Sequence, residues 1–182
     1  LRVKGNKPGN VFCGLVHRID RPVSGTVVFA KTSKALTRMN VLVKQRDFHK
    51  VYWAIVEGRP SESEGHLVHY LFRNEKINKS ILSITEKEGW KRSELEYRLL
   101  ASSERYSVLE VNLLTGRHHQ IRAQLSAIGC PIKGDLKYGA RRSNEDGSIS
   151  LHARNVSFEH PVSHLMVEVT AEPFNQLYYS IL

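Results

Sequence analysis

The sequence has few of the features that mark membrane proteins, disulfide-bonded proteins and zinc proteins. Its apolar runs fall well short of the roughly 20 residues that cross a bilayer, and we expect no signal peptide before the first predicted strand. Cys13 and Cys130 are the only two cysteines in 182 residues, and they lack the spacing of a metal site. We therefore expect reduced thiols in a cytoplasmic protein without membrane contact, although the sequence alone leaves a bridge between them open.

Motifs for nucleotide cofactors and for metals are also missing. There is no glycine-rich phosphate-binding loop of the Walker or Rossmann kind, and no cluster of carboxylates of the sort that holds metal in a nuclease. The sequence has nine histidines, but only His118 and His119 are adjacent, and neighbouring side chains on a helix point in different directions. We therefore predict neither a cofactor nor a metal site.

What the sequence does have is an excess of positive charge. Lys and Arg number 27 against 18 Asp and Glu, which gives a formal net charge of +9. A soluble protein this basic most often binds a polyanion; an anionic membrane surface or solubility alone are the alternatives. The length of 182 residues suits one globular domain with its own core, so we expect a single domain over residues 1–182 and a monomer.

Hydrophobic patterns predict many strands with a few intervening helices. Helices are expected at 33–46, after an N-cap signal at Thr32, and at 118–128, before Gly129 and Pro131. Strands are expected at 26–30, 50–57, 66–72, 94–100, 106–114, 149–158 and 166–170. Polar or weakly patterned residues are predicted as loops at 1–10, 59–65, 73–92 and 141–148. Because hairpins join most strands, the pattern favours an α+β domain.

One segment, residues 17–25 with the sequence His-Arg-Ile-Asp-Arg-Pro-Val-Ser-Gly, carries the strongest chemical signal. It sets the carboxylate of Asp20 among Arg18 and Arg21, just before turn residues and an apolar run. Cationic neighbours favour the ionised form of a carboxylate, as a nucleophile or base acting on a polyanion requires. For Asp20 taken alone, the ordinary interpretation is a turn residue that caps its own backbone.

Two further segments favour the chemical interpretation: residues 50–58, Lys-Val-Tyr-Trp-Ala-Ile-Val-Glu-Gly, and residues 115–122, Thr-Gly-Arg-His-His-Gln-Ile-Arg. Together the three segments resemble the signature motifs of the RluA-type pseudouridine synthases. The resemblance runs from about residue 15 to about residue 173 and includes 131–135, 138–139, 151–153 and 160–161. Members of that family usually have another strand and helix upstream, so we expect a trimmed N-terminus and a polar, truncated segment at 1–10.

The resemblance implies a mixed, largely antiparallel sheet with a few flanking helices and a central RNA-binding cleft. It also implies an isomerase that detaches uracil from C1′ of a ribose in ribosomal or transfer RNA, turns the base and rejoins it through C5, without a cofactor. Asp20 would be the catalytic carboxylate and Arg122 its cationic partner, while Tyr52 would lie against the target base. The ordinary interpretations are a surface helical arginine and a core tyrosine.

An enzyme of this kind must also draw the uridine out of its RNA, at a cost that protein contacts offset. By resemblance, Arg18 fills the space left by the flipped base; a phosphate contact or a surface ion pair are the alternatives. On the helix predicted at 118–128, His118 and Arg122 would share one face. The other residues predicted to bind RNA are Arg21, Lys31, Arg117, His119, Lys133 and Lys137.

The sequence departs from the family pattern at four positions, none of which removes a proposed catalytic residue. Ile19 stands for Leu, Val23 for Thr, Cys130 for His, and Lys133 for a small apolar residue. We therefore expect an active enzyme and leave its RNA target open. An RNA-binding module without catalysis is the main alternative, and an RNA glycosylase or nuclease is a weaker one.

Overall fold

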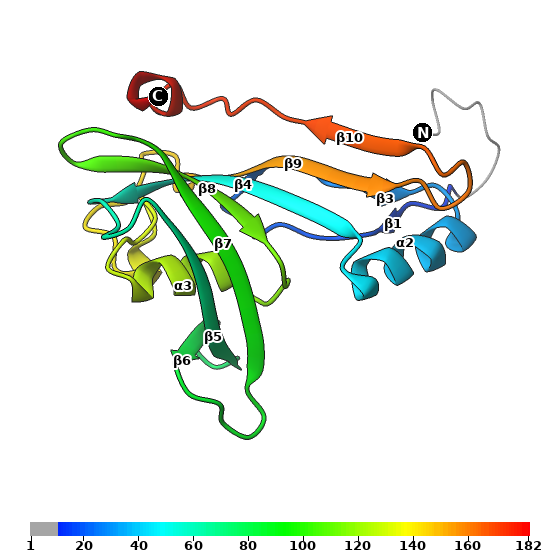
Figure 1. Cartoon of the computed structure of the whole chain (residues 1–182), viewed down its shortest axis with the longest axis horizontal. Helices are drawn as coiled ribbons and strands as arrows, with labels where there is room; N and C mark the ends of the chain where they lie inside the picture. Colours follow the sequence, from blue (N-terminus) through cyan, green and yellow to red (C-terminus); the bar gives the residue numbers. More distant parts are fainter. Residues whose placement is uncertain (1–10) are drawn as a thin grey trace.

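The main sheet of the protein, seen in a computed structural model, is mixed and almost entirely antiparallel (Figure 1). The structure describes residues 11–182, so the loop predicted at 1–10 lies outside the described residues. A short strand, β2 (Ser24–Gly25), pairs in parallel with β9 (Leu151–Glu159). The others follow in the order β10 (Met166–Thr170), β9 (Leu151–Glu159), β4 (Phe48–Glu57), β8 (Tyr106–Leu113), β7 (Lys91–Ser102), β5 (Glu64–Asn74) and β6 (Lys79–Ser83). The predicted mixed, largely antiparallel sheet is thus confirmed.

The two faces of the sheet are covered by different helices (Figure 1). On one face α3 (Gln120–Ala127) packs its Ile121 and Leu125 onto strand residues that include Leu109 and Val111. On the other face Tyr178, from the short helix α4 (Leu177–Ile181), packs with Ile55 and Val108. Side chains alternate between faces along a strand, and this alternation builds two apolar layers from the single strand β8. The helix α4 was not predicted from the sequence.

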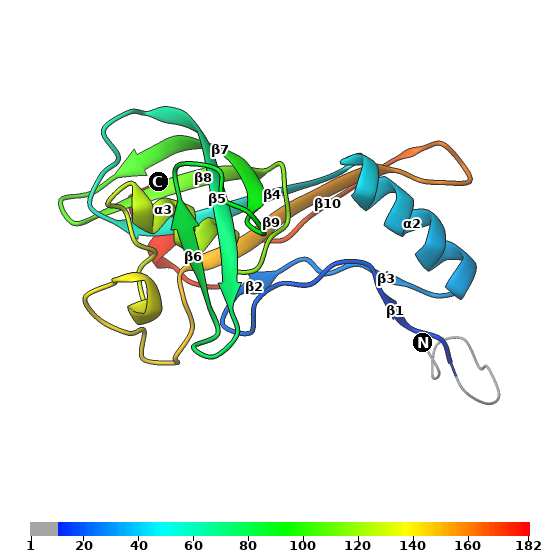
Figure 2. The same cartoon turned by 90° about the horizontal axis from the view of Figure 1, so that it is seen from below.

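A smaller apolar cluster lies at the far end of the molecule from α3 (Figure 2). Here α2 (Ser33–Gln45) begins after Thr32, whose hydroxyl accepts a hydrogen bond from the N–H of Ala35 at 3.1 Å, as expected of an N-cap. The helix ends at Arg46, which has a left-handed backbone (φ 69°). Its apolar stripe packs on a cluster formed by Val16, Ala30, Met39, Phe48, Val156 and Phe158. The helix predicted at 33–46 is confirmed.

The buried strand predicted at 26–30 is largely wrong. Only β3 (Phe29–Ala30) is a strand, and it pairs with β1 (Gly14–Leu15) in a two-stranded ribbon outside the main sheet. Phe29 is 52% exposed, because a two-stranded ribbon beside a helix buries only one of its faces. The apolar run therefore lies on the surface of the smaller cluster, not in the sheet.

The loop predicted at 73–92 is wrong in part, because it contains β6 and the first residues of β7. Contacts with distant residues hold β6 in place. The N–H of Ser80 donates to the hydroxyl of Tyr138 at 2.8 Å, and the Ser80 hydroxyl bonds to the backbone carbonyl of His118. Such long-range partners leave no periodic signal in the local sequence, so pattern analysis misses the strand.

The helix predicted at 118–128 begins two residues later than expected. His119 has a left-handed backbone (φ 51°) and precedes the first residue of α3. His118 consequently lies outside the helix and does not share a helical face with Arg122, which corrects that expectation. The two adjacent histidine rings also stack, with centroids 3.7 Å apart, because helix geometry does not separate them.

The remaining strands predicted from the sequence are all present, as β4, β5, β7, β8, β9 and β10. The segment at 141–148 is a loop, as predicted, and a short 3-10 helix, η1 (Leu136–Tyr138), precedes it. Within residues 11–182, no helix has the length and apolar character needed to cross a membrane.

Candidate active site

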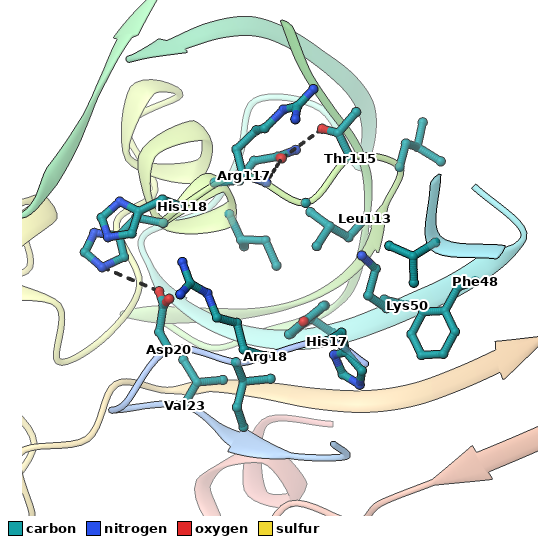
Figure 3. A pocket seen from close by; sticks show the side chains of 18 of the residues that line it. His17, Arg18, Asp20, Val23, Phe48, Lys50, Leu113, Thr115, Arg117 and His118 are labelled. Atoms are coloured by element: carbon teal, nitrogen blue, oxygen red, sulfur yellow. Dashed lines mark hydrogen bonds and ion pairs between the residues drawn. The ribbon is translucent and has the colours of Figure 1, made fainter. Parts of the chain in front are cut away.

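A cleft of about 680 Å³ opens where the loop before β2, the start of β4 and the segment before α3 meet (Figure 3). Six cationic side chains line it: Arg18, Lys44, Arg46, Lys50, Arg117 and Arg122. Asp20 is the one carboxylate among the lining residues that the structure describes. A single anion among many cations is the electrostatic pattern expected of a site that binds a polyanion and also carries out chemistry on it.

The loop that carries Asp20 is fixed at three points to β9 and to the residues just before it. The N–H of Ile149 donates to the carbonyl of Pro22 at 3.0 Å. Gly25 has φ 119° and approaches β9 so closely that a Cβ atom there would lie 2.3 Å from the carbonyl oxygen of Ala153. Ser24 supplies the third point, through its hydroxyl. Only glycine tolerates both this φ and this approach. The Pro-Val-Ser-Gly turn therefore fixes the position of Asp20 relative to the sheet.

The hydroxyl of Ser24 lies 2.8 Å from Nδ1 of His152. The other ring nitrogen, Nε2, lies 2.9 Å from the carbonyl oxygen of Ala171 and must donate to it. Burial lowers the pKa of His152, so the ring is neutral and its Nδ1 accepts from Ser24. This buried histidine therefore links the Asp20 loop to the chain beyond β10.

Arg122 supplies the positive charge beside Asp20. Its Nε and Nη2 donate to Asp135 at 2.7 and 2.8 Å, and its Nη1 donates to Oδ2 of Asp20 at 3.3 Å. Burial disfavours the charge on Arg122, but the hydrogen bonds and charge of Asp135, together with Asp20, outweigh it and raise its pKa. A two-point contact of this kind fixes the plane of the guanidinium, so Asp135 orients the group that faces Asp20.

His119 approaches the same carboxylate from the other side. Its Nε2 is 3.7 Å from Oδ2 of Asp20, and its Nδ1 is 3.1 Å from the hydroxyl of Tyr138. Burial, together with the nearby charge of Arg122, lowers the pKa of His119 to about 4. The ring is therefore neutral at pH 7 and adds a dipole, not a charge, beside Asp20.

Tyr52 forms part of the floor of the cleft. It lies in the middle of β4, at a β-bulge against β9, and is 6% exposed. Burial and the negative charge of Asp20 raise the pKa of its hydroxyl to about 12, so the phenol is protonated at neutral pH. The adjacent Trp53 faces the opposite side of the sheet, where its ring lies 6.3 Å from that of Tyr178.

A family model described as RNA pseudouridylate synthase matches residues 2–127, more than half of the chain. The chain belongs to this family. It is 34% identical over 167 residues to ribosomal large subunit pseudouridine synthase D of Zymomonas mobilis, an alignment that covers 87% of this chain and 52% of that protein. It is 33% identical over 171 residues to ribosomal large subunit pseudouridine synthase C of Vibrio parahaemolyticus, covering 91% of this chain and 53% of that protein.

Solved structures of pseudouridine synthases have the same fold. Human RNA pseudouridylate synthase domain containing 1 superimposes with a TM-score of 0.76 at 26% identity, covering 97% of this chain and 74% of that one. The human domain containing 4 protein has the same TM-score at 22% identity, which supports the fold alone. The chain spans about half the length of the curated relatives it matches.

Within this pseudouridine synthase fold, the structure brings together the three residues predicted to be catalytic. Asp20, Tyr52 and Arg122 all line the one cleft. Of the residues predicted to bind RNA, Arg18, Arg117 and His119 line it as well, His119 as a buried neutral ring. The remaining four, which do not line this cleft, are Arg21, Lys31, Lys133 and Lys137.

Two of these four lysine and arginine residues have structural contacts of their own. The ammonium of Lys133 donates to the side-chain oxygen of Asn144 at 2.6 Å and so holds the loop at 141–148. The ammonium of Lys137 donates to the carbonyl of Asn78 at 3.0 Å and so holds the turn between β5 and β6. Arg21 and Lys31 are exposed. These placements leave the RNA-contact role of all four as a prediction.

The sequence predicts no role for Asp135, Tyr138, His152 or Lys50, although the structure puts each at or beside the site. All four lie in segments that share the family resemblance, which is the available signal, and the first three have partners in the site. Their partners lie between 13 and 128 residues away in the sequence. Sequence spacing alone could not connect them to Arg122, His119 and Ser24.

Proposed function

We propose that this chain is the catalytic domain of an RNA pseudouridine synthase, which isomerises uridine to pseudouridine in structured RNA. The observation that carries the proposal is the placement of Asp20. It is the one carboxylate lining the described cleft, and the guanidinium of Arg122 lies 3.3 Å from it. Family membership supports the reaction. The names of two relatives, both ribosomal large subunit pseudouridine synthases, favour ribosomal over transfer RNA as the substrate.

The reaction breaks the bond from C1′ of the ribose to N1 of uracil and forms a new bond from C1′ to C5; C5 loses a proton and N1 gains one, so the overall composition is unchanged. Asp20 can attack C1′ covalently or remove the proton from C2′, and either route needs one carboxylate at a fixed position. Arg122 holds that carboxylate in place and stabilises its charge in a partly closed site. Neither route calls for a redox change or a transferred group.

Tyr52 and Arg18 fit the handling of the base. The buried ring of Tyr52 offers a face for the uracil, and its protonated hydroxyl can donate a hydrogen bond or relay a proton. Arg18 is exposed, lines the cleft and comes two residues before Asp20. A side chain so placed can enter the space left when the uridine leaves the RNA stack.

The alternative is an RNA-binding module without catalysis on the same scaffold. The basic cleft suits both functions, but the contacts around Asp20 favour the enzyme. A module that only binds RNA gains nothing from a carboxylate in its cleft, because the carboxylate repels phosphate. A nuclease would need several carboxylates to hold metal, and among the described residues no group of three or more His, Cys, Asp or Glu side chains could do so.

The test is release of tritium from large-subunit ribosomal RNA that contains C5-tritiated uridine, measured alongside RNA binding. Wild-type protein should release tritium, and Asp20→Asn should release it at the background rate while binding RNA as well or slightly better. The matched control is Asp47→Asn, since Asp47 is exposed and does not line the cleft. An Asp20→Asn protein that turns over near the wild-type rate would overturn the assignment.

We further propose that the chain acts as a single domain, as a monomer and in the cytoplasm. Within the described residues Cys13 and Cys130 are both free thiols, which fits a reducing compartment. Light scattering of the purified protein, alone and with RNA, tests the oligomeric state.

A further inference from the structure

Lys50 is a cation in the cleft that the proposed chemistry does not use. It comes two residues before Tyr52 on β4, so both side chains leave the same face of the sheet. Figure 3 shows Lys50 toward one end of the cleft and Asp20 toward the other. Among residues 11–182 no carboxylate lies within ion-pair distance of its ammonium, and no acceptor is within hydrogen-bond distance.

The surroundings of Lys50 make this lack of a partner costly. Lys50 is half-buried, and burial lowers the pKa of its ammonium. The adjacent His17 does not compensate, because burial and the charge of Lys50 lower the pKa of that ring to about 4 and keep it neutral. A desolvated cation without an anion is unfavourable. The free protein therefore keeps Lys50 in a state that a bound anion would relieve.

Gly116 keeps the ammonium open to the cleft. A Cβ atom at this position would lie 3.3 Å from Nζ of Lys50, which is closer than ordinary van der Waals contact. Gly116 is exposed and lines the cleft. Its missing side chain therefore leaves space beside the ammonium that a ligand atom can occupy.

The charge of the cleft differs between its two ends. At the Asp20 end, the carboxylates of Asp20 and Asp135 offset the guanidiniums of Arg122 and Arg18, and His119 is neutral, so the charged side chains there roughly balance. Besides Lys50, the other charged side chains that line the cleft are the cations Lys44, Arg46 and Arg117, of which Arg46 lies 3.7 Å from the carboxylate of Glu94. A ligand with one neutral and one anionic part would place its neutral part at Asp20 and its anionic part at Lys50.

We propose that Lys50 binds a phosphodiester of the RNA next to the uridine held by Tyr52 and Asp20, an inference that rests on the proposed function. The base and ribose are the neutral part of a nucleotide and the phosphate is its anion, so the two ends of the cleft match the two parts of one ligand. The ammonium of lysine is a compact charge on a flexible stem, so it can contact a phosphate oxygen in several orientations. Binding then repays the desolvation of Lys50 and anchors the strand for base flipping.

The experiment measures the dissociation constant of a short oligouridylate over a range of salt concentrations. Each phosphate contact to a single strand contributes about 0.7 to the slope of log affinity against log salt. Lys50→Met should reduce the slope by about that amount and weaken binding by roughly tenfold at low salt. Lys34→Met is the matched control, because Lys34 is exposed on α2 outside the cleft, and it should change neither quantity.

A second arm replaces single phosphodiesters of the oligouridylate by neutral methylphosphonates. One such replacement should weaken binding by wild-type protein but not by Lys50→Met protein. The proposal would be overturned if the affinity lost through the methylphosphonate and the affinity lost through Lys50→Met added in full. It would also be overturned if the salt slope of Lys50→Met equalled that of wild type. Either result would indicate that Lys50 contacts the base. Lys50→Met should unfold at the wild-type temperature or above it, because an unpaired, half-buried charge is removed.

The two proposals can fail independently. If wild-type protein releases no tritium but Lys50→Met still lowers the salt slope, the phosphate subsite stands and the enzyme assignment fails. If tritium release depends on Asp20 but the salt slope is unchanged, the enzyme assignment stands and the phosphate subsite fails. Titration of the Lys50 side chain by nuclear magnetic resonance adds a direct readout: its pKa should lie below 10.5 in the free protein and rise on binding the oligouridylate.

Discussion

The guanidinium of Arg122 joins two carboxylates that belong to different parts of the chain. It donates two hydrogen bonds to Asp135, which is 1% exposed, and a longer one to Asp20. The two contacts differ in kind, because the Asp135 pair is buried whereas the Asp20 side chain is 28% exposed and opens to the cleft. Arg122 is thus fixed by Asp135 and presented to Asp20.

This arrangement predicts that Asp135→Asn damages the fold more than Asp20→Asn does. Removing one partner of a buried pair leaves an uncompensated charge and costs about 3–5 kcal/mol, whereas the partly exposed Asp20 should change stability by about 1 kcal/mol in either direction. Chemical denaturation of the two variants beside wild type measures the difference. Equal stability of the two variants would show that Asp135 does not anchor Arg122.

Arg18 and Arg21 offer a matched pair for testing base extrusion. Both are exposed arginines that flank Asp20, but only Arg18 lines the cleft. Arg18→Ala should leave the melting temperature unchanged and reduce both activity and the fluorescence change of a base analogue at the target position. Arg21→Ala should affect these much less. Equal effects of the two substitutions would indicate a general charge effect instead of a role in base flipping.

The histidines of the cleft predict loss of stability in acid. The pKa values of His17 and His119 fall from 6.5 to about 4 on folding, so the unfolded chain binds more protons between those values. Stability is therefore fully present above about pH 6.5 and falls as pH decreases toward 4, by at most about 3 kcal/mol for each ring. Thermal unfolding from pH 7.5 to 4.5 measures this.

A substitution assigns the acid sensitivity to a particular ring. His17→Gln should flatten the pH profile, because an amide does not titrate in this range. His49→Gln serves as the control, since His49 is exposed in the same cleft and should leave the profile as it is. A His17→Gln profile as steep as that of wild type would mean that the ring is not held neutral by burial.

Tyr52→Phe separates the stacking face of the residue from its hydroxyl. The ring is part of the main apolar cluster, so removing only the oxygen should change stability by less than about 1 kcal/mol. We expect the rate of tritium release to fall by about 100- to 10,000-fold, as for loss of a proton relay, with RNA affinity unchanged. A rate equal to that of wild type would restrict Tyr52 to packing against the base.

Much of the sheet could be predicted from the sequence because its strands carry local signals. β4 and β8 are rich in β-branched and aromatic residues and end at turns or glycine, so their period is visible without the rest of the fold. β6 lacks such a signal, since the partners of Ser80 are His118 and Tyr138. The residues of β3 (Phe29–Ala30) are apolar, but this strand pairs with β1 in a separate ribbon outside the main sheet. Local pattern therefore predicts strands better than it predicts their partners.

The candidate site shows the same division between chemistry and support. Asp20, Tyr52 and Arg122 were found because each lies in a segment with a family resemblance. The contacts that hold them are pairwise and distant: Arg122 with Asp135, and Ser24 with His152. The start of α3 was misplaced because the left-handed backbone of His119 is set by its contacts with Tyr138 and Asp20, and not by local helix propensity.

Strand β9 pairs both with β2, which follows the Asp20 loop, and with β4, which carries Tyr52. β9 holds the Asp20 loop through Ser24 and Gly25 and holds Tyr52 through its antiparallel pairing with β4. A displacement of β9 would therefore carry the carboxylate and the tyrosine together and preserve their spacing. The hairpin of β5 and β6 has no such tie to Asp20 or Tyr52 within the sheet. Changes in this hairpin that spare the contacts of Ser80 with His118 and Tyr138 can accumulate over evolution without altering the distance between Asp20 and Tyr52.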